Sequence, residues 1–201
     1  DQLVRQLPAS PVILDIGANA GYFNMILFSK IKTAQVYAYE PIVSNYDLFS
    51  KNIALNPSLQ DQIHVFNKAV TGTPQDYVEL FMEAAADNSV IASVYQDFDT
   101  QNKHTIRVPA ISLAQIMDGN QLTHIDLMKV DCEGSEYPII YETPAAYWSR
   151  VDSLTIEVHN LDDKTRNVDA LKLFLEDKGY ATTIEPAHSN CYTLNAARKH
   201  S

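Results

Sequence analysis

The chain has 201 residues, of which 46% are hydrophobic and 20% are charged. This balance is typical of a soluble globular fold, and we expect a single domain that spans residues 1–201. The 15 Lys and Arg residues face 25 Asp and Glu residues, so the net charge is −10. An acidic surface repels phosphate groups, and the chain has no apolar run of the roughly 20 residues that crossing a membrane requires. We therefore expect neither nucleic acid nor a membrane as partner.

Two further features bear on the cellular location. The chain has only two cysteines, Cys132 and Cys191, and their spacing matches no metal-binding motif. The first residues are polar and do not resemble a signal peptide. These features favour a reducing compartment, and we expect the protein to be cytoplasmic. Because the chain begins with Asp1 and not with Met, we also expect it to be a piece or a processed form of a longer protein.

The first third of the chain alternates short apolar runs with amphipathic segments. Strands are predicted at 12–14, 35–39 and 63–67, and helices at 22–31 and 44–55. Ser44 or Asn45 is expected to cap the second helix. This alternation predicts a parallel sheet with helices on both faces.

The middle of the chain departs from this alternation. Residues 78–82 and 105–108 have the composition of strands, and the polar segment between them lacks periodicity. We interpret the region as a hairpin with a long loop at 84–104. Long loops in compact domains often bind ligands, so the loop, with Tyr95 and Phe98, is a candidate substrate lid. A surface insertion without a binding role is the alternative.

The alternation resumes in the last third of the chain. The last two predicted strands are joined by a loop at 185–190, which is compatible with a hairpin. The pattern predicts a doubly wound sheet with one antiparallel strand near its end, and ligands bind such sheets beyond the carboxyl ends of the strands. The predicted strands are 125–130, 154–158, 181–184 and 191–194, and the predicted helical segments are 112–117, 138–147 and 167–178.

The first candidate site is the turn Asp15-Ile16-Gly17-Ala18-Asn19-Ala20-Gly21, directly after an apolar strand. Gly17 permits a tight turn and a close backbone approach, and Gly21 opens a helix. The backbone N–H groups of the turn are candidates for holding a carboxylate or another polar ligand group. Asn19 replaces the second glycine of a dinucleotide-binding motif, and no phosphate-binding Gly-Lys-Ser/Thr motif is present. The turn therefore suits a ligand with a smaller polar head, or no ligand at all.

Glu40 is the second candidate. It ends the second strand, and a carboxylate at that place can accept hydrogen bonds from both ribose hydroxyls of an adenosine. A solvated glutamate at a strand end is the alternative. Its pairing with the glycine turn favours the ribose role.

Two further clusters follow later strands. Asp131, Glu133 and Glu136 come directly after the strand at 125–130, and Asp131 can act as a base, orient a substrate hydroxyl or bind a hard cation. Glu157 and His159 share one face of the next strand because strands have a period of two. The metal candidates are Asp131, Glu157 and His159. We expect Glu136 to have a structural role. A capping role for Asp131 and a hydrogen-bonded His159 are the alternatives.

Five segments together resemble the FkbM family of S-adenosylmethionine-dependent methyltransferases. They are VILDIGANAGYF, YAYEP, Asn67-Lys68-Ala69, VPAISLAQI and IDLMKVDCEGSEY, and the resemblance runs from Val12 to His159. It implies an α/β, three-layer Rossmann-like methyltransferase fold. The implied sheet is mostly parallel and has seven strands in the order 3-2-1-4-5-7-6, with strand 7 antiparallel. The hairpin and loop would then form an insertion between strands 3 and 4.

The resemblance also implies a cofactor and roles for the candidate residues. The cofactor would be S-adenosylmethionine, and the product S-adenosylhomocysteine. Its contacts would be Asp15, Gly17, Asn19 and Gly21 at the methionine end, Glu40 at the ribose, Asn67 and Ala69 near the adenine, and Asp131 and Glu133 at the methyl-transfer end.

The function that follows is O-methylation of a hydroxyl on a small molecule, sugar or natural product. We expect His159 to act as base and Asp131 to orient the acceptor, with Glu133, Glu157 and Tyr95 as further acceptor contacts. A divalent metal is a candidate additional cofactor. The alternatives are a non-catalytic S-adenosylmethionine-binding module of a larger enzyme and an NAD-dependent oxidoreductase, which the missing second glycine disfavours.

Overall fold

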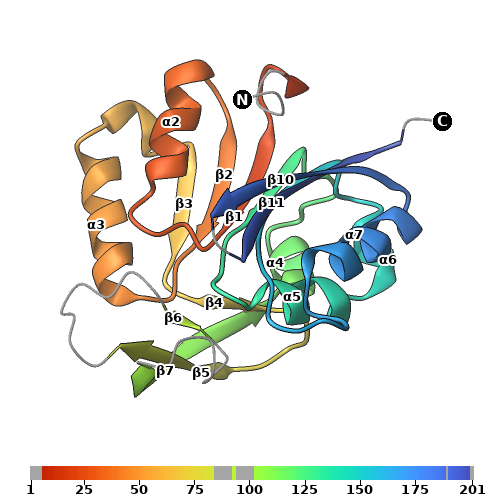
Figure 1. Cartoon of the computed structure of the whole chain (residues 1–201). Coiled ribbons are helices and arrows are strands. Elements are labelled where there is room, and N and C mark those ends of the chain that lie inside the picture. The colour runs from red at the N-terminus through yellow and green to blue at the C-terminus, as the bar shows by residue number, and fades with distance from the viewer. Residues whose placement is uncertain (1–5, 84–91, 94–101, 189, 200–201) are drawn as a thin grey trace.

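The computed structural model describes residues 6–83, 92–93, 102–188 and 190–199 of the chain. They form a large sheet between two groups of helices and a smaller sheet at one end (Figure 1). Most of the predicted substrate loop 84–104, including Tyr95 and Phe98, lies outside the described residues.

The large sheet has seven strands in the order β10-β11-β9-β8-β1-β2-β3. Strand β11 is antiparallel to both of its neighbours, and the other pairs are parallel. Counted along the chain, these strands stand in the order 3-2-1-4-5-7-6, so the predicted topology is confirmed. Their bounds are β1 (Val12–Ile16), β2 (Gln35–Tyr39), β3 (Ile63–Phe66), β8 (Leu127–Val130), β9 (Ser153–His159), β10 (Tyr180–His188) and β11 (Cys191–Arg198).

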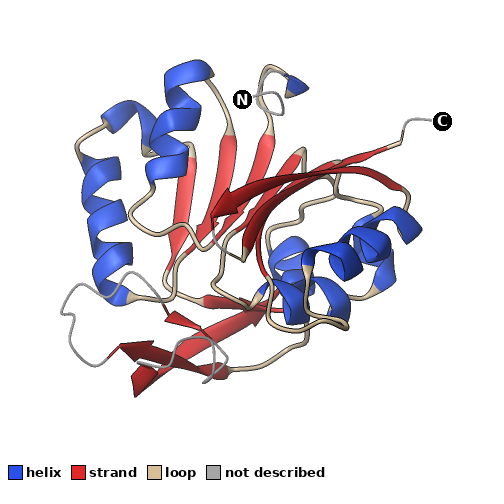
Figure 2. Cartoon of the chain, viewed as in Figure 1, coloured by secondary structure: helices blue, strands red, loops and turns tan. Residues whose placement is uncertain are grey.

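Helices cover both faces of the large sheet (Figure 2). Successive residues of β1 point to opposite faces, so Ile13 belongs to one buried cluster and Leu14 to the other. The first cluster packs against α2 (Tyr22–Lys30), α3 (Val43–Ala54) and the short η1 (Pro57–Leu59). The second packs against α4 (Leu113–Gly119), α5 (Glu136–Glu142), α6 (Ala145–Trp148) and α7 (Val168–Asp177). None of the helices in the described part of the chain has the length and apolar content that crossing a membrane requires.

The smaller sheet is inserted between β3 and β8 and lies at the carboxyl ends of β1, β2 and β3 (Figure 1). Its order is β4-β7-β5-β6, with bounds β4 (Ala69–Thr71), β5 (Tyr77–Glu83), β6 (Ala92–Ser93) and β7 (Asn102–Ser112). The predicted hairpin is confirmed as the antiparallel pair β5 and β7. The sequence did not predict β4, which pairs with β7 in parallel, or β6.

Two local predictions about element ends are wrong. Helix α3 has Ile42 as its N-cap residue and not Ser44 or Asn45, and the carboxylate of Glu40 accepts the N–H of Ile42 at 2.9 Å. The predicted loop 185–190 is largely strand, because β10 continues to His188 and β11 begins at Cys191.

Candidate active site

The carboxyl ends of β1, β2, β8 and β9 open onto a cavity of about 280 Å³. The smaller sheet closes one side of it through Leu80 of β5 and Ala69 and Val70 of β4. A cavity at this end of a doubly wound sheet is the usual place of a ligand site. Its lining combines apolar residues with four carboxylates. The lining residues are Ile16, Gly17, Asn19, Tyr39, Glu40, Pro41, Ile42, Lys68, Ala69, Val70, Leu80, Asp131, Cys132, Glu133, Ser135 and Glu157.

The turn after β1 depends on two glycines. Gly17 has a φ of +76°, and a Cβ there would lie 1.7 Å from the carbonyl oxygen of Asp131. Gly21 has a φ of +83°, and a Cβ there would lie 2.2 Å from the ring of Phe49. Asn19 also adopts a positive φ, which asparagine tolerates better than most residues. The predicted tight turn with close backbone approach at Gly17 and the helix start at Gly21 are therefore confirmed, and each glycine has a specific packing partner.

The N–H groups of this turn all find acceptors within the chain. Those of Gly17 and Ala18 donate to the carbonyl of Tyr39, each at 3.0 Å, and that of Gly21 donates to Ala18. The N–H of Asn19 donates to Glu40 at 2.8 Å, and that of Ala20 donates to the side chain of Asn19. These N–H groups are therefore paired within the chain in this structure, and their holding of a carboxylate or another polar ligand group stays a prediction.

Glu40 lies at the end of β2 with its carboxylate fixed from two sides. One oxygen accepts the N–H of Asn19 at 2.8 Å, and the other accepts the N–H of Ile42 at 2.9 Å. The residue is 4% exposed and lines the cavity. Burial raises the pKa of Glu40, and the two backbone hydrogen bonds partly oppose this rise. An oriented carboxylate therefore faces the cavity, as the sequence predicted.

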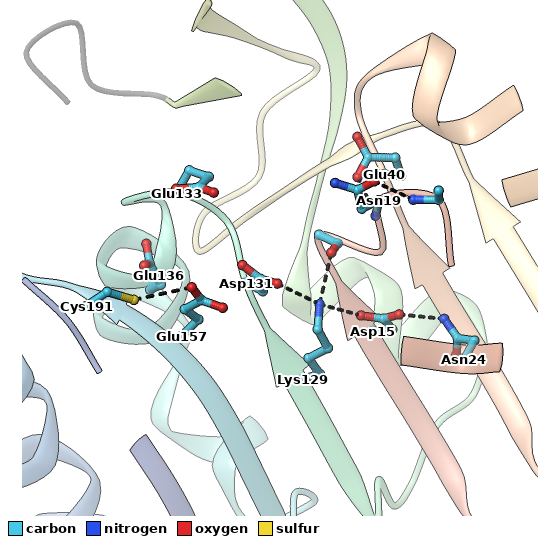
Figure 3. A network of polar contacts seen from close by, with 12 residues as sticks. Asp15, Asn19, Asn24, Glu40, Lys129, Asp131, Glu133, Glu136, Glu157 and Cys191 are labelled. Atoms are coloured by element: carbon cyan, nitrogen blue, oxygen red, sulfur yellow. Dashed lines mark hydrogen bonds and ion pairs between the residues drawn. The ribbon is translucent and has the colours of Figure 1, made fainter. Parts of the chain in front are cut away.

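Lys129 ties the turn to β8 (Figure 3). Its ammonium lies 3.3 Å from Asp15, 3.2 Å from Asp131 and 3.0 Å from the carbonyl oxygen of Gly17. Asp15 is fully buried and also accepts a hydrogen bond of 2.6 Å from the buried amide of Asn24. Burial lowers the pKa of Lys129, but the two carboxylates raise it more, so the lysine stays charged.

The roles of Lys129 and Asn24 were not predicted from the sequence. Asp15 and Lys129 face each other in the register of β1 and β8, although more than a hundred positions separate them in the chain. Only the pairing of the two strands shows that they form an ion pair. Asn24 stands in the first turn of α2, and no sequence motif marks it as a partner of Asp15.

The segment after β8 carries the second acidic part of the cavity. Glu133 has a φ of +48°, lines the cavity and lies 3.3 Å from Nε2 of His159. Burial raises the pKa of Glu133, and the charge of His159 opposes this rise. Burial also raises the pKa of the Cys132 thiol well above its ordinary value. A thiol of this kind stays protonated and packs as a small apolar group.

His159 ends β9 behind this segment. Its Nδ1 lies 2.8 Å from the carboxylate of Glu136, which is fully buried. Its Nε2 lies 3.3 Å from Glu133 and 4.0 Å from Glu157. Burial lowers the pKa of His159, but the hydrogen bond and charge of Glu136 and the nearby Glu133 and Glu157 outweigh burial, so the net shift is upward. The three carboxylates around His159 therefore favour its protonated form.

The structure divides the predicted site residues into two groups. Seven of them line the cavity: Gly17, Asn19, Glu40, Ala69, Asp131, Glu133 and Glu157. The described residues that line it do not include Asp15, Gly21, Asn67 or His159. Asp15 is buried against Lys129 and Asn24, and the Asn67 amide donates to the carbonyls of Glu40 and Pro41, each at 2.9 Å. Asp15 and Asn67 thus hold neighbouring parts of the chain in place without lining the cavity.

The predicted metal ligands are brought together only in part. Among the described residues, Glu157 and His159 offer ligand atoms within 4.8 Å of those of His188 and Cys191, and Asp131 is not in this group. The carboxylate of Asp131 pairs with Lys129 instead. His188 and Cys191 were given no role by the sequence analysis, because their spacing matches no motif and only the pairing of β10 with β11 brings them to this place.

The strand order, with a cavity at the carboxyl ends of the strands, defines the class of the fold, which is that of the Rossmann-like methyltransferases. More particularly, residues 15–182 match the model of the methyltransferase FkbM domain, so the chain belongs to the FkbM family of methyltransferases.

Two curated relatives agree with this assignment. Methyltransferase sdnD of Sordaria araneosa is 28% identical over 212 residues, which cover 92% of this chain and 79% of the relative. The 31-O-demethyl-FK506 methyltransferase FkbM of Streptomyces tacrolimicus is 22% identical over 201 residues, which cover 90% of this chain and 76% of the relative.

Solved structures show the same fold. The methyltransferase FkbM of Methylobacillus flagellatus superposes with a TM-score of 0.64 at 16% identity, over 94% of this chain and 44% of that one. TrmK of M. capricolum, solved in complex with S-adenosylhomocysteine, superposes with a TM-score of 0.52 at 14% identity, over 98% of this chain and 66% of that one.

Proposed function

We propose that the protein uses S-adenosylmethionine to methylate a hydroxyl group of a small molecule. The observation that carries this proposal is the carboxylate of Glu40. It is held by the N–H groups of Asn19 and Ile42 and lines the same cavity as Asp131 and Glu133. One end of the cavity thus suits a ribose diol, and the other end is acidic.

The lining fits the parts of this cofactor. A carboxylate with two oriented oxygens can accept hydrogen bonds from both ribose hydroxyls. The apolar side chains of Ile42, Val70 and Leu80 line the cavity and suit an adenine ring. Asp131 and Glu133 place negative charge where the cationic sulfonium would lie, which is favourable in a half-buried site.

The relatives support the same assignment. The name of the Streptomyces tacrolimicus relative gives 31-O-demethyl-FK506 as the compound that it methylates, and the TrmK structure contains S-adenosylhomocysteine. Both proteins share the fold or family of this chain, so we carry the cofactor and the kind of acceptor over as proposals.

The bound cofactor would supply an activated methyl group, so the protein's task is to orient the acceptor and remove its proton. Glu133 is better placed as the base than His159, because Glu133 lines the cavity and the described lining does not include His159. A raised pKa also makes Glu133 a stronger base than an ordinary carboxylate. Asp131 is held by Lys129 at 3.2 Å and would orient the acceptor hydroxyl.

Thermal unfolding with S-adenosylhomocysteine tests the cofactor. A ligand at about 100 times its dissociation constant stabilises the folded state by about 2.7 kcal/mol, which is a Tm shift of roughly 5–10 °C for this size. We expect this shift in the wild type and in Glu185→Ala, a variant of an exposed carboxylate on β10, and its loss in Glu40→Ala. A shift with NAD instead would contradict the proposal.

Single-turnover kinetics test the base. Glu133→Gln should slow methyl transfer by about 10²–10⁴-fold, because the general base is lost, and leave the Kd of S-adenosylhomocysteine unchanged. His159→Gln is the matched comparison. If His159→Gln abolished turnover while Glu133→Gln kept the wild-type rate, His159 and not Glu133 would be the base.

Product analysis tests the acceptor class. The enzyme should transfer the labelled methyl group of S-adenosylmethionine to members of a hydroxyl-bearing small-molecule panel, and NMR of the product should show an O-methyl group. A product methylated on nitrogen or carbon would contradict the hydroxyl assignment. Tight cofactor binding without turnover across the panel would favour the non-catalytic module.

A further inference from the structure

The edge of the large sheet gathers four metal-binding side chains on one face. Cys191 of β11 stands opposite His159 of β9 in the register, and His188 of β10 stands opposite Cys191. Glu157 lies two residues before His159 and points to the same face. The ligand atoms of these four residues all lie within 4.8 Å of one another.

The distances are close to those of a tetrahedral site. Oε1 of Glu157 lies 3.2 Å from Nε2 of His188, 3.3 Å from Sγ of Cys191 and 4.0 Å from Nε2 of His159. A tetrahedron with metal–ligand bonds of ~2.0–2.3 Å has edges of ~3.3–3.8 Å. Small side-chain rotations therefore suffice to bring all four atoms around one ion.

The kinds of ligand atom select the metal. One thiol, two imidazoles and one carboxylate suit a borderline-soft ion that prefers four ligands, and zinc is the most common such ion in proteins. Calcium and magnesium need oxygen ligands, which this set does not supply in sufficient number.

The surroundings of His159 resemble those of a metal ligand. Its Nδ1 lies 2.8 Å from the fully buried carboxylate of Glu136, and the hydroxyl of Tyr137 donates to its carbonyl oxygen at 2.7 Å. A histidine that binds a metal through one nitrogen almost always pairs the other with a carboxylate, a carbonyl or water. The contact with Glu136 thus directs Nε2 toward the other three ligands.

The four residues also differ in burial, which bears on the side from which an ion would enter. Cys191 is fully buried, whereas the side chain of His188 is 64% exposed. The buried thiol would lie at the inner side of the ion, and the exposed imidazole marks the side from which an ion can enter. Glu157 also lines the cavity, so the site borders the proposed acceptor end.

We propose that Glu157, His159, His188 and Cys191 form a site for one divalent transition-metal ion, with zinc as its natural occupant. Binding would form a metal–sulfur bond and release the thiol proton of Cys191, together with any proton on Nε2 of His159, to solvent. The proposal goes beyond methyl transfer and does not depend on it, because metal binding is measured without cofactor or acceptor.

The test is metal binding by the purified chain after treatment with a chelator. We expect one equivalent of Zn²⁺ to bind in calorimetry, and Co²⁺ in its place to give the sulfur-to-cobalt charge-transfer absorption of a thiolate ligand. Cys191→Ala should lose this absorption. His188→Ala should weaken the Kd for Zn²⁺ at least about tenfold, and its exposed position leaves folding intact.

A second group of side chains provides the control. His124 lies 3.1 Å from Asp126 and 3.2 Å from Asp152 at the other end of the sheet, and its side chain is 46% exposed. His124→Ala should leave Zn²⁺ binding unchanged. Stoichiometric binding that is lost in His124→Ala and kept in His188→Ala would overturn the proposal, as would the absence of Zn²⁺ binding at micromolar concentrations or a Co²⁺ spectrum without the thiolate band.

Discussion

The two ends of the cavity are built in different ways. At the end formed by β1 and β2, the two carboxylates have fixed partners, since Asp15 pairs with Lys129 of β8 and backbone N–H groups hold Glu40. At the end formed by β8 and β9, the carboxylates of Glu133, Glu136 and Glu157 surround one histidine. The first end therefore presents a fixed arrangement of polar groups to a ligand. The second end carries excess negative charge, which an acceptor proton or a cation relieves.

The largest effect on stability should come from removing Lys129, the partner of the buried Asp15. Lys129→Met leaves the carboxylate of Asp15 buried without its counter-charge, and such a loss costs about 3–5 kcal/mol of unfolding free energy. Urea denaturation measures it. The double variant Asp15→Asn, Lys129→Met should recover part of the loss, because the unpaired charge at position 15 is then removed as well. A single variant as stable as the wild type would show that the pair is not needed.

A smaller loss should follow from a methyl group at the turn. In Gly17→Ala, the positive φ and the clash with the carbonyl of Asp131 should together cost about 2–4 kcal/mol. Gly179→Ala is the matched control, because Gly179 has a φ of +90° but no atom within 4 Å of an added Cβ. It should cost only about 1–2 kcal/mol. Equal losses in urea denaturation would mean that the close approach of the turn to β8 contributes nothing.

The charge of Glu40 should appear in a pH dependence. Because the pKa of Glu40 is raised, the affinity for S-adenosylhomocysteine should fall as the pH decreases through that pKa, with a limit of about tenfold per pH unit. Without ligand, the free energy of unfolding should show the opposite trend with pH. A raised pKa favours the folded state at low pH, and this contribution is lost as the pH rises through the folded-state pKa.

Glu40→Gln is the control for both trends. In this variant the affinity for S-adenosylhomocysteine should vary little with pH. The unfolding free energy should also lose the part of its pH dependence that the titration of Glu40 causes. Calorimetry and urea denaturation at several pH values measure the two trends. The same pH profile in both proteins would assign it to another group.

The smallest effect should be a gain in stability. It is expected at the end formed by β8 and β9, where three carboxylates surround His159. Glu157→Gln removes one negative charge beside Glu133 and Glu136 and keeps an oxygen that can accept the hydrogen bond from Cys191. In the presence of a chelator, the variant should be about 0.5 kcal/mol more stable than the wild type, and the gain should shrink in high salt. A clear loss of stability would show that the negative charge of Glu157 stabilises the fold.

The sequence predicted most of the sheet because its strands are apolar runs that end in functional residues. The turn around Gly17, the carboxylate of Glu40 and the acidic segment after β8 could be located in this way. The strand β4 could not, because it has only three residues and follows β3 almost directly. The capping residue of α3 was wrong because a carboxylate from the preceding turn takes the place of a capping side chain.

The interactions that the sequence did not predict join distant positions. Lys129 and Asp15 meet because β1 and β8 are neighbours in the sheet, and His188 and Cys191 meet Glu157 because β11 folds back beside β9. Neither contact follows from local spacing. The strand order was predicted, but the register that places these residues side by side was not.

The closeness of Gly17 to Asp131 has a thermodynamic consequence. The backbone of the turn rests directly on the carbonyl oxygen of the residue that leads to Glu133, with no space for a methyl group between them. A ligand that displaces one of these segments must therefore displace the other. By linkage, any coupling between the two halves of the cavity is reciprocal, so whatever an acceptor does to cofactor affinity, the cofactor does equally to acceptor affinity.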